Sequence, residues 1–179
     1  INGVVELTNE EIIEIAGLGG RKYYFSLDVG NVQNRLEAHH LVRTAVVEKV
    51  FPDSLEISLT SREPLAMALV EGEGRTVPIV FDSEGVVFQI GRSVSAFNLP
   101  VISGLRFESL SLGQRLPRQL SGFFQDLREL QETEPDLISA ISEIRVIRRN
   151  DVDYELLLYP SHYNIPVRTG SELNERLLE

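Results

Sequence analysis

Apolar and polar residues alternate most clearly between positions 42 and 66. From 55 to 59, leucine and isoleucine take every second position, a period typical of a strand with one buried face. Ala45 and Val47 indicate a similar strand just before it. The intervening residues 51–54, Phe-Pro-Asp-Ser, favour a turn, because proline presets φ and aspartate accepts hydrogen bonds from nearby amides. The pattern therefore predicts a β-hairpin.

Two short helices are predicted upstream of this hairpin. Thr8 and Glu11 have the spacing of a capping box, in which each side chain bonds the backbone of the other. Apolar residues follow, and the glycines within 17–20 end this first helix. Asp28 is placed to cap a second helix, whose apolar residues within 29–36 recur every three or four positions.

The remaining residues of this first part complete one predicted domain. Residues 23–27 alternate briefly and predict an extended link, and residues 1–3 resemble the tail of a strand. The order is helix, helix, strand, strand, with a largely missing first strand. Proline within 62–64 lacks the N–H that a strand ladder needs, so we place the domain boundary there. The predicted domains are 1–63 and 64–179.

The second part is predicted to be rich in strands, with one long helix. Tight turns are expected at 82–85 and 150–153, and an apolar stripe over 116–130 predicts a helix that stops near 134–135. A last helix begins at Ser171. The expected strands are 65–70, 77–81, 86–90, 99–104, 144–147, 154–158 and 165–167. Both parts together indicate the α+β fold class.

Composition narrows the function classes. The 179 residues are 42% hydrophobic and 25% charged, as in an ordinary globular protein, and cysteine is absent, which excludes disulfides and thiolate chemistry. The formal net charge of −10 argues against nucleic-acid binding. The densest basic cluster, Arg145, Arg148 and Arg149, is interpreted as a solvated strand end. No apolar run approaches the length of about 20 residues that spans a bilayer.

Candidate chemistry is sparse. His39 and His40 are adjacent and cannot share one face of a regular element, and His162 stands apart, so a metal site is disfavoured. The pair Asp82 and Glu84 is interpreted as turn polarity. No phosphate loop, dinucleotide fingerprint or serine nucleophile elbow occurs. The aromatic residues 23–25 are either an exposed patch or partly core. We therefore expect no catalytic residues, no cofactor, no metal and no small-molecule substrate.

The first sixty-odd residues resemble a POTRA domain, and the whole chain resembles the extracytoplasmic part of the FtsQ/DivIB cell-division family. The resemblance rests on a series of short motifs in the same order and spacing. These are Gly3, Leu7-Thr8, Glu11-Ile12, Ala16-Gly17-Leu18, Tyr24-Phe25, Leu27-Asp28, Val42, Ala45, Val47, Phe51-Pro52-Asp53-Ser54-Leu55-Glu56-Ile57, Arg62-Glu63-Pro64-Leu65-Ala66, Phe81-Asp82, Gly85-Val86-Val87-Phe88, Leu99-Pro100 and Gly104.

The resemblance implies a non-enzymatic scaffold of the division septum. It implies an extracytoplasmic, periplasmic region of a single-pass protein of the cytoplasmic membrane, anchored upstream of Ile1. It also implies FtsB- and FtsL-like coiled-coil partners, through which septal peptidoglycan synthesis is regulated, and a β domain cut short at Glu179. Two alternatives remain open: a POTRA protein of outer-membrane protein assembly or two-partner secretion, and an unrelated extracytoplasmic hydrolase.

In this family the main partner contact lies on the terminal helix and last strand, and the resemblance implies that this last strand lies beyond Glu179. The candidate partner-binding residues here are therefore Ile165, Val167, Arg168, Leu173, Arg176 and Leu177. A sheet edge offers unpaired N–H and C=O groups to a partner strand, and arginine is enriched at interface hot spots. The alternative for Leu173 and Leu177 is that they pack the last helix onto the sheet. The edge 45–50 of the first domain is a second candidate surface.

Overall fold

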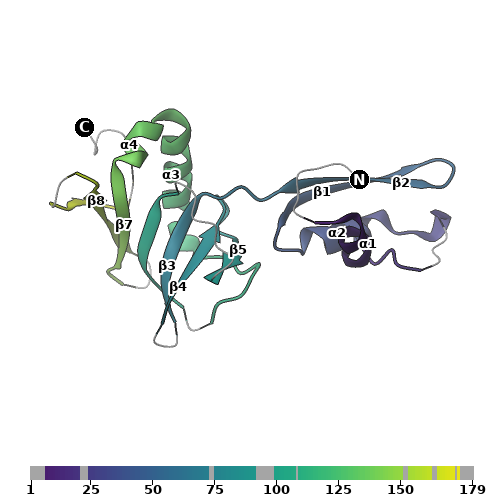
Figure 1. Ribbon diagram of the computed structural model, residues 1–179, viewed down its shortest axis with the longest axis horizontal. Helices are drawn as coiled ribbons and strands as arrows, with labels where there is room; N and C mark the ends of the chain where they lie inside the picture. The colour runs from purple at the N-terminus through teal and green to yellow at the C-terminus, as the bar shows by residue number, and fades with distance from the viewer. Residues whose placement is uncertain are drawn as a thin grey trace. The chain divides into compact units, whose positions relative to one another are not determined.

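The chain divides into two compact units, Ile1–Arg62 and Glu63–Glu179. Each unit has its own cluster of buried apolar side chains. The computed structural model describes residues 7–20, 24–72, 75–91, 99–107, 109–150, 153–162, 165–171 and 173 (Figure 1). Its helices and strands confirm the predicted α+β class. The strand expected at residues 1–3 lies outside the described residues.

The first unit contains the predicted hairpin. Strands β1 (Val42–Val50) and β2 (Ser54–Ser61) pair antiparallel, and the Phe51–Pro52 peptide bond in the turn is cis. The side chains on one face of the hairpin are buried, as the alternation predicted. Strand β2 ends before Arg62, as the proline at position 64 predicted. The buried residues are Val42, Ala45, Val47, Ile57 and Leu59.

Two helices supply the other half of this core. Helix α1 (Asn9–Ile15) begins at a complete capping box, since the Glu11 N–H donates to the Thr8 hydroxyl and the Thr8 N–H donates to the Glu11 carboxylate. The Thr8 hydroxyl also donates to the Glu11 carboxylate, and the hydrogen bonds from the Thr8 N–H and hydroxyl lower the pKa of Glu11. Helix α2 (Val29–Glu37) begins at Asp28, which accepts a hydrogen bond from Asn31 at 3.2 Å. Both caps were predicted from the sequence.

The expected extended link before α2 is wrong. Tyr24–Ser26 forms a 3-10 turn, η1, in which the Leu27 N–H donates to the Tyr24 carbonyl. The alternation of apolar residues suggested a strand, but Tyr24–Ser26 has no neighbouring strand to pair with among the described residues. A local hydrogen bond between residues three positions apart satisfies the backbone instead. Phe25 is 82% exposed, so of the two alternatives for the aromatic residues 23–25 it fits the exposed patch.

The second unit is built on one seven-stranded sheet of order β5-β4-β3-β6-β7-β8-β9. The β3–β6 and β6–β7 pairs are parallel, and the other pairs are antiparallel. The connection between the parallel strands β6 and β7 contains the two described α-helices of this unit, Ser121–Thr133 and Pro135–Ser139. The strands are β3 (Ala66–Gly72), β4 (Arg75–Phe81), β5 (Val87–Ile90), β6 (Val101–Arg106), β7 (Ile141–Arg148), β8 (Tyr154–Pro160) and β9 (Val167–Thr169).

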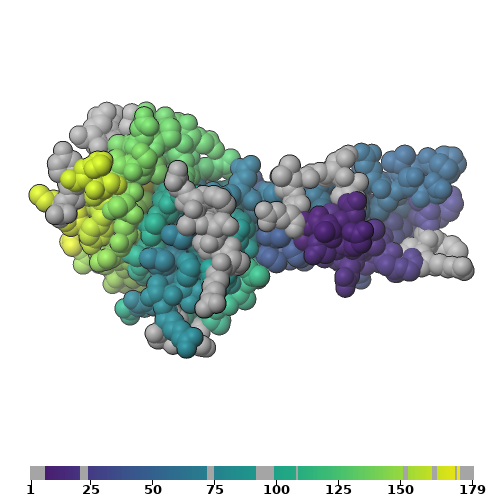
Figure 2. Space-filling view, viewed as in Figure 1, coloured from purple at the N-terminus to yellow at the C-terminus, as the bar shows by residue number. Residues whose placement is uncertain are grey.

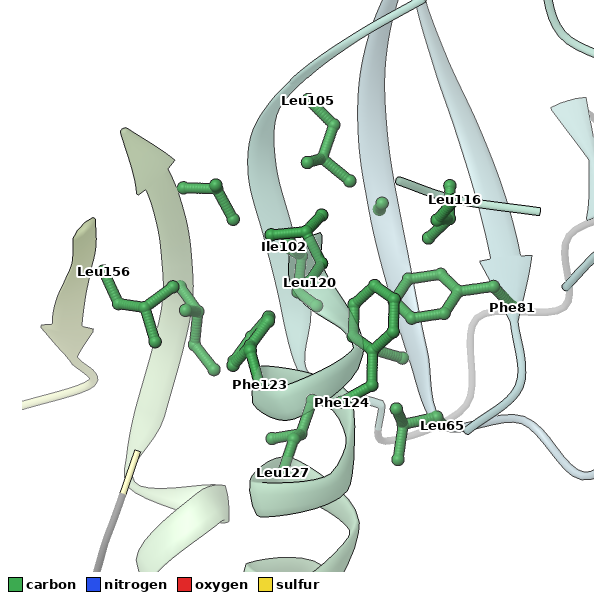
Figure 3. Packing of buried hydrophobic residues seen from close by; sticks show 14 of the residues in the cluster. Leu65, Phe81, Ile102, Leu105, Leu116, Leu120, Phe123, Phe124, Leu127 and Leu156 are labelled. Atoms are coloured by element: carbon green, nitrogen blue, oxygen red, sulfur yellow. The ribbon is translucent and has the colours of Figure 1, made fainter. Parts of the chain in front are cut away.

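Helix α3 (Ser121–Thr133) covers one face of this sheet. Phe123, Phe124 and Leu127 project from the helix toward the strands that carry the other core residues (Figure 3). The Phe124 ring lies 4.8 Å from the Phe81 ring of β4, centroid to centroid. This face therefore holds the predicted apolar stripe, and it forms the core of the second unit.

Two details of this helical region differ from prediction. Leu116 belongs to the stripe by spacing, but it precedes η3 (Arg118–Leu120) and the helix, and its N–H donates to the Gly85 carbonyl. Pro135 was expected only to stop a helix. It also begins α4 (Pro135–Ser139), because a proline at the first helical position loses no internal hydrogen bond.

Candidate functional site

The two edges of the seven-stranded sheet differ. At the β5 edge, the Val87 N–H donates to the Gln114 carbonyl at 2.8 Å, and the Gly113 N–H donates to the Val87 carbonyl at 2.7 Å. The chain therefore covers this edge with its own backbone at Val87. At the other edge, β9 pairs with β8 and with no further strand among the described residues. An edge of this kind can accept a strand from another chain.

The backbone of Arg168 faces the open side of β9. Arg168 lies opposite Leu157, and the Leu156 N–H donates toward β9, to the Gly170 carbonyl at 3.1 Å. Because hydrogen-bonded and non-hydrogen-bonded pairs alternate along an antiparallel ladder, Leu157 and Arg168 form a non-hydrogen-bonded pair. The N–H and C=O of Arg168 therefore point away from β8.

The candidate residues from the sequence occupy different environments. Val167 and Arg168 lie in β9, and Val167 is 41% exposed. Ile165 was expected within the strand, which is wrong, because the pairing of β9 with β8 begins at Val167. Ile165 lies beside the edge and is 77% exposed. In the space-filling view part of the C-terminal region, in yellow, lies at the surface (Figure 2).

The other three candidates do not lie on the described surface. Leu173 is 2% exposed and belongs to the core cluster of the second unit, which favours the alternative that it packs against the sheet. Arg176 and Leu177 lie outside the described residues, as does most of the last helix expected from Ser171. The described part of the candidate site is therefore the stretch from Ile165 to Arg168.

The open edge carries a small network of charges. The Glu155 carboxylate lies 2.7 Å from the Arg149 guanidinium and 3.6 Å from that of Arg168. The hydrogen bond from Arg149 lowers the pKa of Glu155, and the charges of Arg149 and Arg168 lower it further. Two arginines thus share one carboxylate, so this network holds two positive charges and one negative charge.

The basic cluster expected at a strand end is divided between two networks. Arg149 binds Glu155, whereas Arg145 donates to Glu143 at 3.1 Å and lies 5.0 Å from the Tyr159 ring centroid. The Ser103 hydroxyl also donates to Glu143. Each of these two arginines therefore has an ion-pair partner on a strand of the sheet, Glu143 of β7 for Arg145 and Glu155 of β8 for Arg149.

The predicted second surface is half buried. Along β1, Ala45 and Val47 are 2% and 6% exposed, whereas Val46 and Val50 are 54% and 44% exposed, as alternation requires. Phe51 in the turn is 79% exposed, which the sequence analysis did not single out. Its position between two predicted strands was the available signal, since turn residues point into solvent.

The remaining candidates for chemistry form no site in the described structure. His39 and His40 stack with ring centroids 4.4 Å apart, and the described residues contain no group of three side chains that could hold a metal ion. Asp82 caps its own turn, accepting hydrogen bonds from Glu84 and Val86. Among the described helices, none combines the length and apolar composition needed to cross a bilayer.

Comparison with known proteins places these features in a family. Residues 1–62 match the POTRA domain family of the FtsQ type. The chain is 28% identical over 163 residues to the cell division protein FtsQ of Syntrophotalea carbinolica, covering 91% of this chain and 55% of that protein. It is 28% identical over 177 residues to FtsQ of Anaeromyxobacter sp. strain K, covering 98% of this chain and 57% of that protein.

A third relative matches more strongly over a shorter stretch. FtsQ of Bradyrhizobium diazoefficiens is 36% identical over 104 residues, covering 58% of this chain and 29% of that protein. The chain therefore spans at most about half the length of these relatives. The order of helices and strands in the first unit agrees with the POTRA match. The first unit belongs to the POTRA domain family of the FtsQ type, and the chain is similar to FtsQ cell division proteins over most of its length.

Proposed function

We propose that this chain is the partner-binding part of a division-septum scaffold. In this proposal the second unit pairs its β9 edge with a strand from a small, single-pass coiled-coil protein of the FtsB or FtsL type. The scaffold performs no chemistry itself and regulates septal peptidoglycan synthesis through these partners. The observation that carries the proposal is the open edge at β9, where the Arg168 backbone faces away from the sheet.

Three properties of this edge support strand addition. The opposite edge of the sheet is covered by residues 113 and 114, so β9 is the open edge of the described sheet. Ile165 and Val167 are exposed beside it and can contribute apolar contacts. The excess of arginine over glutamate favours a partner segment with a carboxylate near Arg168.

We also propose the domain assignment and the location that this role requires. The first unit is the POTRA domain and the second is the FtsQ-type β domain, joined near Arg62 and Glu63. Both lie in the periplasm, anchored by a helix encoded upstream of Ile1. The gene sequence tests this anchor, which requires a segment of about 20 apolar residues upstream; a cleaved signal peptide there would contradict it.

The decisive experiment separates the Arg168 backbone from its side chain. Arg168→Pro removes the N–H that faces the open edge. It disrupts no ladder bond to β8, because the Arg168 N–H points away from β8, and proline is tolerated at such a position of an edge strand. We expect calorimetric titration with the soluble part of an FtsB-like protein to show a loss of affinity of at least about tenfold. The titrated protein should extend past Glu179.

Arg168→Ala is the matched control, because it removes the charge and keeps the N–H. We expect a smaller loss of affinity, and one that shrinks at high salt. Thermal unfolding of both variants checks that the fold is intact. If Arg168→Pro binds as tightly as the unchanged protein, the partner does not add a strand to β9. Arg176→Glu then tests whether the contact lies on the last helix instead.

A further inference from the structure

The segment that follows β9 is fastened to the second unit at three points. The Tyr154 hydroxyl donates to the Ser171 carbonyl at 3.0 Å. The Leu173 N–H donates to the Asp126 carboxylate at 3.0 Å. The Leu173 side chain is 2% exposed and lies in the same core cluster as Phe123 and Leu127 of α3. The residues after the edge strand are thus joined both to β8 and to the helix beneath the sheet.

Strand β9 needs such support because it is short. It has three residues and pairs with one neighbour in the described sheet, whereas strands in globular proteins usually have five or six. Its register begins after Pro166, and Val167 and Arg168 are exposed. Few contacts of its own therefore hold β9 in place, and elements of this kind open locally at low cost.

Asp126 is suited to hold the end of this segment. It lies in the middle of α3, next to the buried Leu127, and is half-buried itself. A carboxylate that accepts a backbone N–H makes a stronger bond than a neutral acceptor does. The bond joins residues 47 positions apart, so it fixes the chain after β9 relative to a rigid helix.

We infer that Asp126 is a positioning residue for the partner-binding edge: by holding Leu173 against α3, it keeps β9 paired with β8. The inference rests on the proposed function for its biological meaning. A partner strand can add to β9 only while β9 is paired with β8. The affinity for the partner therefore falls as the fraction of molecules in which β9 has separated from β8 rises. Preorganisation of the edge thus depends on a helix that does not itself lie at the edge.

Hydrogen exchange of the unbound chain tests the inference. The Leu156 N–H donates to Gly170 and reports whether β9 and its following residue are in place, whereas Leu157 lies opposite Arg145 of β7 and reports on the rest of the sheet. We expect Asp126→Ala to raise the exchange rate of the Leu156 amide about tenfold or more. The exchange rate of the Leu157 amide should stay the same.

Two further variants make the result specific. Glu129→Ala removes the same charge from the exposed side of the same helix and should leave the Leu156 amide unchanged. Asp126→Asn keeps an acceptor oxygen and should give a smaller increase than Asp126→Ala, and it replaces Asp126→Ala if that variant does not fold. Equal acceleration at Leu156 and Leu157, or no acceleration at either, would overturn the inference.

The titration of the proposed function remains a separate test. Hydrogen exchange measures the fraction of molecules in which β9 has separated from β8. This fraction predicts the loss of affinity for the partner that Asp126→Ala should cause. Asp126→Ala could accelerate exchange at Leu156 alone while Arg168→Pro binds the partner as tightly as the unchanged protein does. That outcome would support the positioning role of Asp126 and would refute β9 as the partner site. Failure of the two ideas can therefore be told apart.

Discussion

At the scale of single residues, the two adjacent histidines make the first unit sensitive to pH. Burial lowers the pKa of His39, partly offset by the charge of Glu11, and burial followed by the charge of His39 lowers the pKa of His40. Their rings stack with centroids 4.4 Å apart, so protonation of one disfavours protonation of the other. Both imidazoles thus favour the neutral form in the folded state.

The consequence for stability follows from proton linkage. The unfolded chain binds protons with the ordinary histidine pKa of 6.5, and the folded unit binds them only at lower pH. The contribution of the neutral histidines to the free energy of unfolding is therefore complete above the pKa of the unfolded chain. It is lost as the pH falls from that value through the lower pKa values of the folded unit. Between about pH 7.5 and pH 5.5 we expect the unchanged protein to lose more stability than His40→Gln.

Urea unfolding followed through NMR signals of α1 and α2 measures this loss in the first unit. His162→Gln is a control, because His162 is exposed and belongs to the second unit. The carboxylates with lowered pKa, Glu11 and Glu155, titrate below this window and do not interfere. If His40→Gln and the unchanged protein lose stability equally, the histidines are not the source of the pH dependence.

At the scale of secondary-structure elements, β6 depends on a glycine in a bulge. Ala68 and Val70 of β3 lie opposite Ile102 and Leu105, so two residues of β6 face one of β3. Gly104 takes the positive φ of 84° that this bulge requires, and a Cβ there would collide with the Val146 carbonyl oxygen of β7. The backbone of the central parallel strands therefore closes around a position without a side chain.

Gly104→Ala should lower the free energy of unfolding of the second unit by about 2 kcal/mol or more, since strain at positive φ adds to a backbone collision. Gly122→Ala is the matched control, because Gly122 lies in α3 with nothing within 4 Å of an added Cβ. That control should be neutral or slightly stabilising. Chemical denaturation measures both. Equal stability of the two variants would contradict the role of the bulge.

Elements whose signals are local could be predicted from the sequence. The capping box at Thr8 and the cap at Asp28 are both present, because each depends on residues within one helical turn. The hairpin and the apolar stripe of α3 are present because the spacing of apolar residues reflects one buried face in each. In the hairpin they recur every second position, and in α3 every three or four positions. Such features carry their own physical cause within a few residues.

Features set by contacts across the sheet could not be predicted in this way. Ile165 lies outside β9 because the strand depends on pairing with β8, and the role of Leu116 depends on the Gly85 carbonyl. The environment of Leu173 is decided by α3, and Asp126 reads in the sequence as an ordinary polar helix residue. Within the candidate site, the sequence therefore did not indicate which side chains reach the surface.

At the scale of the whole molecule, the two units have separate cores. No residue belongs to both clusters: one lies between Leu7 and Leu59, and the other between Leu65 and Leu173. The first unit has 62 residues, and a domain of that size buries only about 60% of the surface of its unfolded chain. Its stability margin is therefore smaller than that of the second unit, which is nearly twice as long.

We therefore expect residues 63–179 to fold without the first unit. Their amide chemical shifts should match those of the same residues in the whole chain, because every described contact of the β9 edge lies within this unit. Residues 1–62 alone should unfold at lower urea concentration. Under the proposed function, 63–179 extended past Glu179 binds the FtsB-like partner as tightly as the extended whole chain does. Widespread shift changes around β8 and β9 in the shortened protein would show instead that the edge depends on the POTRA unit.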